Sequence, residues 1–147
     1  MAAATIAVAS DHAGFDLKEV LKRDLEAAGH DVLDLGTNSN SSVDYPDFGQ
    51  AMAEAIASGK ASRGVLVCGS GIGISIAANR NPKVRAALAH DVVSARLSRE
   101  HNDANVVAFG QRLIDVETAR EALKVFLSTP FEGGRHAARV AKLSKEM

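Results

Sequence analysis

Tryptophan is absent from the sequence, cysteine and tyrosine occur once each, and aromatic residues make up only 4% of the 147 residues. A single cysteine cannot form a disulfide within the chain, and an all-thiolate metal clip would need at least two. These shortages predict a protein of a reducing compartment, and we expect it in the cytoplasm. Because Tyr45 and Cys68 are the sole representatives of their residue types, the presence of each needs an explanation.

Neither sign of charge dominates, since 17 lysines and arginines stand against 18 aspartates and glutamates. We therefore expect neither a nucleic acid nor a membrane surface as a partner. The apolar runs are far shorter than the roughly 20 residues that cross a bilayer, and the first residues do not resemble an export signal. What the sequence does contain is 46% apolar residues. That is enough for the core of one domain, which we expect over residues 1–147.

Strand-like and helix-like segments alternate along the chain. Short apolar runs predict five strands, at residues 5–9, 32–35, 64–68, 84–89 and 105–109. Apolar residues at helical spacing predict helices between them, and a last helix from about residue 135. The polar stretch 36–42 predicts an exposed loop. This order predicts an α/β fold, with a five-stranded parallel sheet flanked by helices and an additional C-terminal helix.

Ligands of such sheets bind beyond the carboxyl ends of the strands. One of these ends is rich in glycine: residues 68–73 read CGSGIG. Glycines at alternate positions let the backbone turn tightly and present several N–H groups at the start of a helix. Such a nest can bind a phosphate or an oxyanion that forms during a reaction. A tight turn without any ligand is the alternative.

A dinucleotide-binding loop is a second alternative for this segment. Its fingerprint is G-x-G-x-x-G after the first strand of a βαβ unit, whereas the glycines here are spaced G-x-G-x-G. Asp91 lies at a suitable distance downstream. The spacing therefore weakens this alternative without excluding it.

Several side chains at these strand ends and near the C-terminus can do chemistry. Cys68 precedes the glycines, where the positive end of a helix dipole favours a thiolate that acts as base or nucleophile, although an inert buried cysteine is the alternative. Arg135 and Arg139 are one helical turn apart and can hold one phosphate together, or they belong to an ordinary basic surface helix. No two histidines have the spacing of a helix-borne metal site. We expect no metal and no organic cofactor, while a metal site assembled from distant residues stays open.

Five motifs occur in order along the chain: SDHAG at 10–14, DYP at 44–46, CGSGIG at 68–73 followed by IAAN at 76–79, SREHNDAN at 98–105, and GGRH at 133–136. With them the chain resembles the B-type ribose-5-phosphate isomerases, a family that includes galactose-6-phosphate isomerase subunits and allose-6-phosphate isomerases. The resemblance runs from residue 6 to about residue 140. It implies a flavodoxin-like or Rossmann-like domain that forms a homodimer, or a dimer of dimers, with active sites shared between subunits.

The resemblance also implies a role for each matching residue. Cys68 would be the base, and His101 would open the sugar ring. The enediolate would be held by the Ser70 hydroxyl and the backbone N–H groups of Gly69, Ser70, Gly71, Ile72 and Gly73. The phosphate would be bound by His12, Arg112, Arg135 and Arg139, and the sugar oxygens by Asp11, Tyr45 and Asn102. One branch of the family carries its base on a glutamate in the glycine loop, but that position here is Ile74.

These roles describe an aldose–ketose isomerase that interconverts ribose 5-phosphate and ribulose 5-phosphate through an enediolate. The same chemistry on a six-carbon substrate, allose 6-phosphate or galactose 6-phosphate, is the nearest alternative. A non-catalytic binder of sugar phosphates or nucleotides is another, but it gives no reason for Cys68, His101 and Asn102. An enzyme with a cysteine nucleophile is the third.

Overall fold

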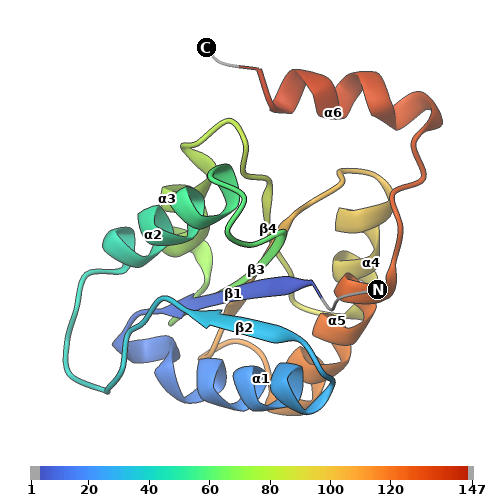
Figure 1. Ribbon diagram of the computed structural model, residues 1–147. Coiled ribbons are helices and arrows are strands. Elements are labelled where there is room, and N and C mark those ends of the chain that lie inside the picture. The colour runs from blue at the N-terminus through green and yellow to red at the C-terminus, as the bar shows by residue number, and fades with distance from the viewer. Residues whose placement is uncertain (1–3, 146–147) are drawn as a thin grey trace.

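The computed structural model describes residues 4–145 and contains alternating strands and helices (Figure 1). In chain order these are β1 (Thr5–Ser10), η1 (His12–Gly14), α1 (Phe15–Ala27), β2 (Asp31–Asp34), α2 (Tyr45–Ala57), β3 (Arg63–Cys68), α3 (Ile72–Asn79), β4 (Ala86–Leu88), α4 (Val92–Glu100), β5 (Val106–Gly110), α5 (Val116–Ser128), η2 (Gly134–His136) and α6 (Ala137–Leu143). The two η elements are single 3₁₀ turns. Between residues 4 and 145, none of the helices has the length and apolar character needed to cross a membrane.

The five strands form one parallel sheet in the order β2-β1-β3-β5-β4. The predicted α/β fold with a five-stranded parallel sheet is therefore confirmed. The last two positions are exchanged relative to the flavodoxin order 2-1-3-4-5. Burial explains the exchange, because every residue of the apolar strand β5 is buried, whereas the three residues of β4 are only half-buried at the edge. A fully apolar strand is more stable in the centre of a sheet.

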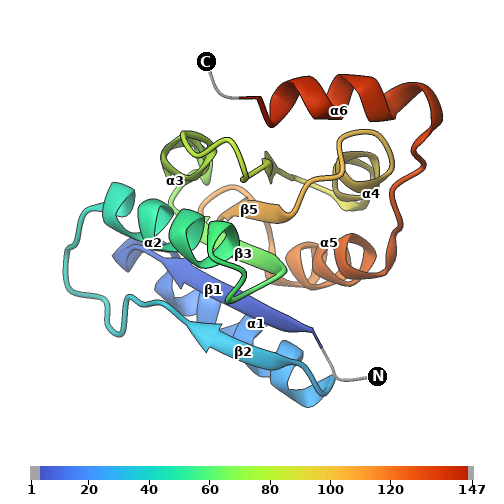
Figure 2. The same ribbon diagram turned by 45° about the horizontal axis from the view of Figure 1, so that its top comes forward.

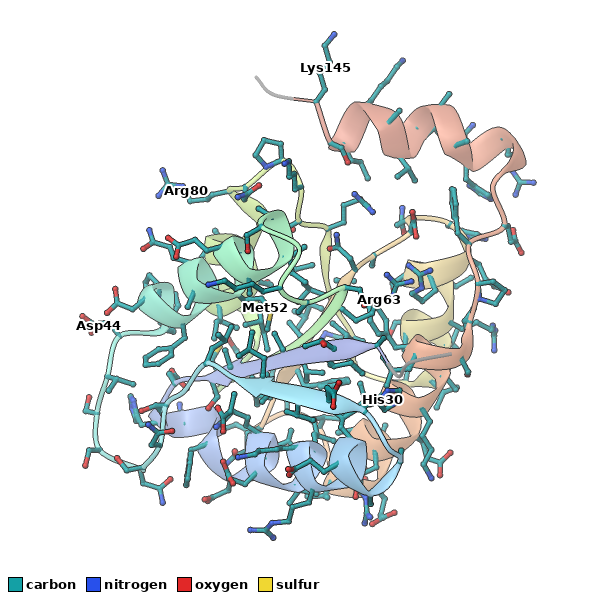
Figure 3. The ribbon with its side chains drawn as sticks, viewed as in Figure 1. His30, Asp44, Met52, Arg63, Arg80 and Lys145 are labelled. Atoms are coloured by element: carbon teal, nitrogen blue, oxygen red, sulfur yellow. The ribbon has the colours of Figure 1, made fainter. Side chains whose placement is uncertain are left out.

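Helices cover both faces of the sheet. Helices α1, α4 and α5 pack on one face, where Leu21 and Phe126 lie in the same apolar cluster as Phe109 of β5. Helices α2 and α3 cover the other face, and Figure 3 shows Met52 lying between α2 and the sheet. Burying a side chain of this size contributes about 2 kcal/mol, so the two apolar clusters hold the strand ends in place.

The structure corrects three local predictions. The stretch 36–42 is not exposed at its start, because Gly36 and Thr37 continue the pairing along β1: the Ser10 N–H donates to the Gly36 carbonyl (2.8 Å) and the Thr37 N–H to the Ser10 carbonyl (2.9 Å). The fourth strand, expected over residues 84–89, extends only from Ala86 to Leu88. The last α-helix begins at Ala137, after a 3₁₀ turn.

Lys18 of α1 is fully buried. Its ammonium group contacts the carboxylates of Asp34 at 2.9 Å and Glu19 at 3.1 Å, and Lys22 also contacts Asp34. Burial alone would raise the pKa of Asp34, but hydrogen bonds from Lys18, the Gly36 N–H and Lys22 outweigh it and lower the pKa. The network ties α1 to the carboxyl end of β2.

Helix α6 is set apart from the layers around the sheet, and both ribbon views show it joined to α5 by an extended connection (Figures 1 and 2). Its C-terminal end is tethered where the Arg85 guanidinium donates to Ser144 Oγ at 2.9 Å. A cavity of about 360 Å³ lies between Leu143 and the residues around β4, including Asn102 and Ala104. Helix α6 therefore lies over this cavity and contributes little to the main core.

Candidate active site

A pocket of about 650 Å³ opens at the carboxyl edge of the sheet, where β1 and β3 end. The strand that follows β1 in the chain, β2, pairs on one side of it, whereas β3 and the strands after it lie on the other side, so this is the topological switch point at which open α/β sheets bind ligands. The pocket is lined by Asp11, His12, Ala13, Tyr45, Cys68, Gly69, Ser70, Ile72, Gly73, Ile76, Arg112 and Leu113. The sheet therefore brings together most of the residues that the sequence places near a ligand.

Cys68 is the last residue of β3 and is buried at the base of this pocket. The Gly71 N–H donates a hydrogen bond to its Sγ atom at 3.1 Å. This N–H group places partial positive charge against the sulfur. The turn requires glycine at position 71, where φ is +77° and an added Cβ would lie 2.6 Å from Leu88 Cδ1.

The backbone N–H groups after Cys68 are arranged differently from the expected open nest. Besides the Gly71 N–H, the Ile72 N–H has an acceptor inside the loop, since it donates to Ser70 Oγ at 3.2 Å. Two of the five amides expected to face a bound oxyanion are thus directed at the thiol and the hydroxyl. These two N–H groups therefore hold the Cys68 and Ser70 side chains in place, which the glycine spacing did not indicate.

The aromatic ring of Tyr45, in the first turn of α2, lies against this loop. A Cβ at Gly73 would be 2.5 Å from Tyr45 Cε1 and 2.6 Å from Cζ, so the close approach requires glycine. The phenol is 42% exposed and lines the pocket. This position allows its hydroxyl to hydrogen-bond a polar ligand.

Asp11 and His12 enter the pocket from the end of β1. The Gly14 N–H donates to Asp11 Oδ1 at 3.1 Å, which caps η1 and holds the buried carboxylate in place. The Val43 N–H donates to His12 Nδ1 at 3.1 Å. A neutral His12 ring therefore carries its proton on Nε2, which makes that nitrogen a hydrogen-bond donor.

Arg112 follows the end of β5 and completes the basic side of the pocket. Its N–H donates to the Gly69 carbonyl at 3.0 Å, which joins the two loops. The guanidinium lies over Gly69, where an added Cβ would be 3.1 Å from Nη1. Because the side chain is exposed, it is available to an anionic ligand.

Five of the predicted site residues are absent from the lining of this pocket in the described chain: Gly71, His101, Asn102, Arg135 and Arg139. Gly71 lies in the glycine loop itself, with its N–H directed at Cys68 Sγ. His101 ends α4, and Asn102 lines the cavity below α6. Arg135 belongs to η2 and Arg139 to α6, and both side chains are exposed. Within one chain, the predicted site residues therefore lie in two separate regions, the pocket at the edge of the sheet and the region near α6.

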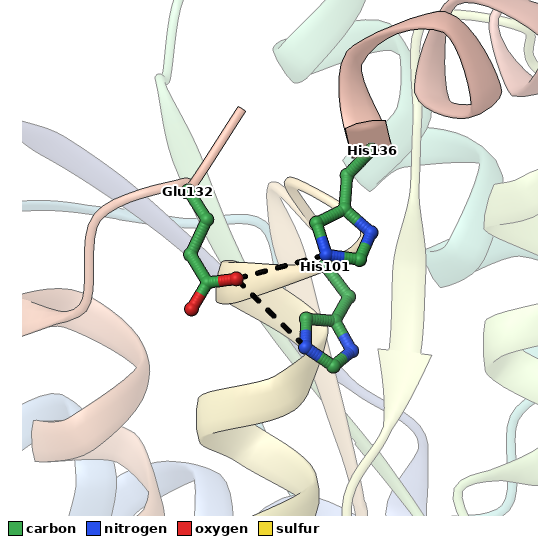
Figure 4. A group of neighbouring side chains, drawn as sticks. All are labelled: His101, Glu132 and His136. Atoms are coloured by element: carbon green, nitrogen blue, oxygen red, sulfur yellow. Dashed lines mark ion pairs between the residues drawn. The ribbon is translucent and has the colours of Figure 1, made fainter. Parts of the chain in front are cut away.

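His101 instead lies in a cluster that the sequence did not indicate (Figure 4). Its ring stacks on that of His136 with centroids 4.4 Å apart, and Glu132 Oε1 lies 4.0 Å from His101 Nε2 and 3.6 Å from His136 Nε2. Burial lowers the pKa of His136, and the positive charge of Arg135 lowers it further. The sequence does contain one signal for this cluster, the Glu-x-x-x-His spacing of residues 132 and 136. A motif defined by two histidines does not include it.

A buried arginine positions this region. The Arg99 guanidinium donates to Asp103 Oδ1 (2.8 Å), to the Ala104 carbonyl (2.7 Å) and to the Thr129 carbonyl (3.1 Å). It thus links the turn that carries His101 to the segment that carries Glu132.

Three residues that line the pocket were not predicted from the sequence: Ala13, Ile76 and Leu113. Small and apolar side chains give no chemical signal in a sequence.

The chain is similar to known proteins over nearly its whole length. The family model described as Ribose/Galactose Isomerase matches residues 6–143. Ribose-5-phosphate isomerase B of Escherichia coli is 43% identical over 139 residues, which cover 95% of this chain and 93% of that protein. D-erythrulose-4-phosphate isomerase of Pectobacterium atrosepticum is 40% identical over 140 residues, which cover 95% and 92%. The solved structure of Clostridium thermocellum ribose-5-phosphate isomerase B has a TM-score of 0.94, is 48% identical and matches 95% of each chain.

Proposed function

The chain belongs to the ribose/galactose isomerase family, and we propose that it interconverts ribose 5-phosphate and ribulose 5-phosphate through an enediolate. It is a sugar-phosphate isomerase of the ribose-5-phosphate isomerase B type. The observation that carries the proposal is the buried thiol of Cys68 at the switch point of the sheet, with the Gly71 N–H directed at its Sγ. A supported thiolate below an anion-binding pocket suits the removal of a proton next to a carbonyl.

The reaction begins with ring opening, which requires a group that can both accept and donate a proton near neutral pH. We assign this step to His101. The imidazole takes the proton of the anomeric hydroxyl as the ring carbon–oxygen bond breaks, and the resulting imidazolium delivers this proton to the ring oxygen. The product of this step is the open-chain aldehyde.

Cys68 then transfers the proton between carbons. The thiolate removes the proton from carbon 2, the electron pair forms the enediolate, and the neutral thiol afterwards protonates carbon 1. A proton moves from the oxygen on carbon 2 to that on carbon 1, which completes the ketose. The Ser70 hydroxyl and the backbone N–H groups of the loop stabilise the enediolate oxygen, and losing one donor of this kind costs about 3 kcal/mol.

Phosphate binding divides between two chains in this proposal. His12 and Arg112 approach the phosphate from the pocket's own chain, and Arg135 and Arg139 come from a second subunit, which also supplies His101 and Asn102. Exposed apolar side chains at the pocket support the assignment: Ile72, Ile76 and Leu113 are 49%, 62% and 61% exposed. Such a rim is typical of a surface that another protein chain covers.

The carbon number of the substrate is the less constrained part of the proposal. A pocket of about 650 Å³ has room for four-, five- or six-carbon sugar phosphates. The relative from Pectobacterium atrosepticum carries the name of a four-carbon enzyme, whereas those from Escherichia coli and Clostridium thermocellum carry the name of the five-carbon one. We favour ribose 5-phosphate because the two five-carbon relatives from Escherichia coli and Clostridium thermocellum have the higher identities, 43% and 48% against 40%.

The test is an assay for conversion of ribose 5-phosphate to ribulose 5-phosphate in excess chelator, with the Cys68→Ala variant alongside. The wild type is expected to turn over, and the variant to lose about 10³-fold in kcat while still binding the sugar phosphate. Four- and six-carbon sugar phosphates, including allose 6-phosphate and galactose 6-phosphate, are then ranked by kcat/KM. Substantial turnover by a folded Cys68→Ala variant would remove the cysteine base, and a higher kcat/KM for another sugar would change the substrate.

A further inference from the structure

The cluster of His101, Glu132 and His136 presents three metal-binding atoms at one place, near the start of α6. We propose that it is a binding site for a divalent transition-metal ion such as Zn²⁺, and that the bound ion inhibits the enzyme. The second half of this proposal rests on the proposed role of His101, whereas the first half stands on the cluster alone.

Two imidazoles and one carboxylate are a donor set that binds zinc in proteins. The three ligand atoms lie within 4.8 Å of one another. Figure 4 shows one carboxylate oxygen of Glu132 facing a ring nitrogen of each histidine. The three candidate ligand atoms therefore lie close together on one side of the stacked rings.

A second observation concerns the polar atom at the centre of the cluster. His136 Nε2 is buried and has no hydrogen-bond partner in the part of the chain that the structure describes. Leaving a buried polar atom unpaired destabilises the fold. Because the same atom faces the Glu132 carboxylate at 3.6 Å, a metal ion between them would satisfy both groups.

Closing the site requires only small movements. Ligand atoms around a tetrahedral zinc ion are about 3.3 Å apart, since each lies about 2.0 Å from the metal. The His101 and Glu132 side chains are 38% and 50% exposed and can shift, whereas the His136 side chain is 8% exposed and stays fixed. The backbone beneath them is held, because the Glu132 N–H donates to the Glu100 carbonyl at 3.1 Å. Water would take the fourth position.

The nearby charges limit the strength of binding. Arg135 and Arg139 both repel positive charge at His136, and Glu132 is the one carboxylate of the cluster. We therefore expect an affinity on the order of ten micromolar, far weaker than that of a structural zinc site. An ion on the His101 imidazole occupies a lone pair needed for ring opening, so the metal acts as an inhibitor and not as a cofactor.

Binding is tested with Co²⁺ on the full-length protein after removal of metals by a chelator. Co²⁺ that enters a low-coordinate site absorbs visible light, which reports binding without an activity assay. One ion per chain is expected. Glu132→Gln should weaken binding at least about tenfold, and the matched Glu121→Gln, on the exposed surface of α5, should leave it unchanged. Equal binding by wild type and Glu132→Gln would overturn the site.

The thiol of Cys68 is the main competing ligand for these ions. Metal binding that persists in Cys68→Ala supports the histidine cluster, and binding that disappears in this variant overturns it. Saturating ribose 5-phosphate should weaken Co²⁺ binding to the wild type if the cluster faces the bound sugar.

Inhibition is tested separately by titrating Zn²⁺ into the isomerase assay. We expect the concentration for half-inhibition to rise at least about tenfold in Glu132→Gln and to stay unchanged in Glu121→Gln. Tight Co²⁺ binding with full activity would overturn the inhibitory role and also the role of His101 in ring opening. An active isomerase that binds no metal would overturn the metal site and leave the proposed function standing.

Discussion

The pocket at the carboxyl edge of the sheet and the histidine cluster near α6 are built in different ways. Cys68 ends the buried strand β3 and Asp11 directly follows the buried strand β1, and the core packed around those strands holds them in place. Glu132 lies on an extended connection, and Arg139 lies on a helix set apart from the main layers (Figure 2). The first group is positioned before any ligand arrives. We infer that the second group acquires its working position from a second chain.

Mixing two inactive variants gives the largest expected effect and tests that inference directly. Cys68→Ala and His101→Ala are unfolded together in equal amounts and refolded. If each active site takes Cys68 from one chain and His101 from its partner, half of the sites in a mixed dimer are intact. Activity should then rise from near zero to about a quarter of the wild-type value. No gain over the separate variants would mean that each site is built from one chain.

His101→Ala alone tests the catalytic role proposed for the histidine cluster. We expect kcat for cyclic ribose 5-phosphate to fall about 10²-fold, with a smaller change in KM, because the residue is assigned to ring opening and not to binding. Steady-state kinetics in excess chelator measure both values. His90→Ala is the control, since His90 is exposed and does not line the pocket. An unchanged kcat in His101→Ala would remove its assigned role.

A pair of glycine substitutions compares the rigidity of the two regions. Gly71→Ala should cost about 3 kcal/mol of unfolding free energy, because a side chain at φ +77° is strained and its Cβ would overlap Leu88 and Phe109. Gly134→Ala should cost about 1 kcal/mol, since φ is +55° but the added Cβ meets nothing within 4 Å. Urea denaturation measures both. Equal losses would contradict the difference in packing.

The last test concerns the buried Lys18 network of the sheet. Asp34→Asn should cost about 2 kcal/mol at neutral pH, because within residues 4–145 Lys18 then has only the Glu19 carboxylate as an anionic partner. The folded-state pKa of Asp34 is lowered, so its contribution is complete above the unfolded value near about 4 and is lost as the pH falls through the lowered value. Denaturation at several pH values should show the wild type and the variant converging only below about pH 4. A difference that stays constant below that pH would contradict the assignment.

The pocket could largely be predicted from the sequence because its residues follow apolar runs. The carboxyl ends of parallel strands meet at one edge, so Asp11, Cys68 and Arg112 converge wherever the strands pair in parallel. The glycine spacing likewise indicated a turn. It did not indicate that the Gly71 and Ile72 amides would be directed at Cys68 and Ser70, because that depends on the dihedral angles of individual residues.

The sequence by itself determined the number and order of strands and helices, since apolar periodicity reports which residues a folded chain must bury. It also determined which reactive side chains end the central strands. The tertiary structure alone decided that β5 lies between β3 and β4 in the sheet, that Lys18 is buried, and that His101 stacks on His136 near Glu132. These contacts join segments far apart along the chain. They depend on how whole elements pack in three dimensions, and no local pattern of residues records that packing.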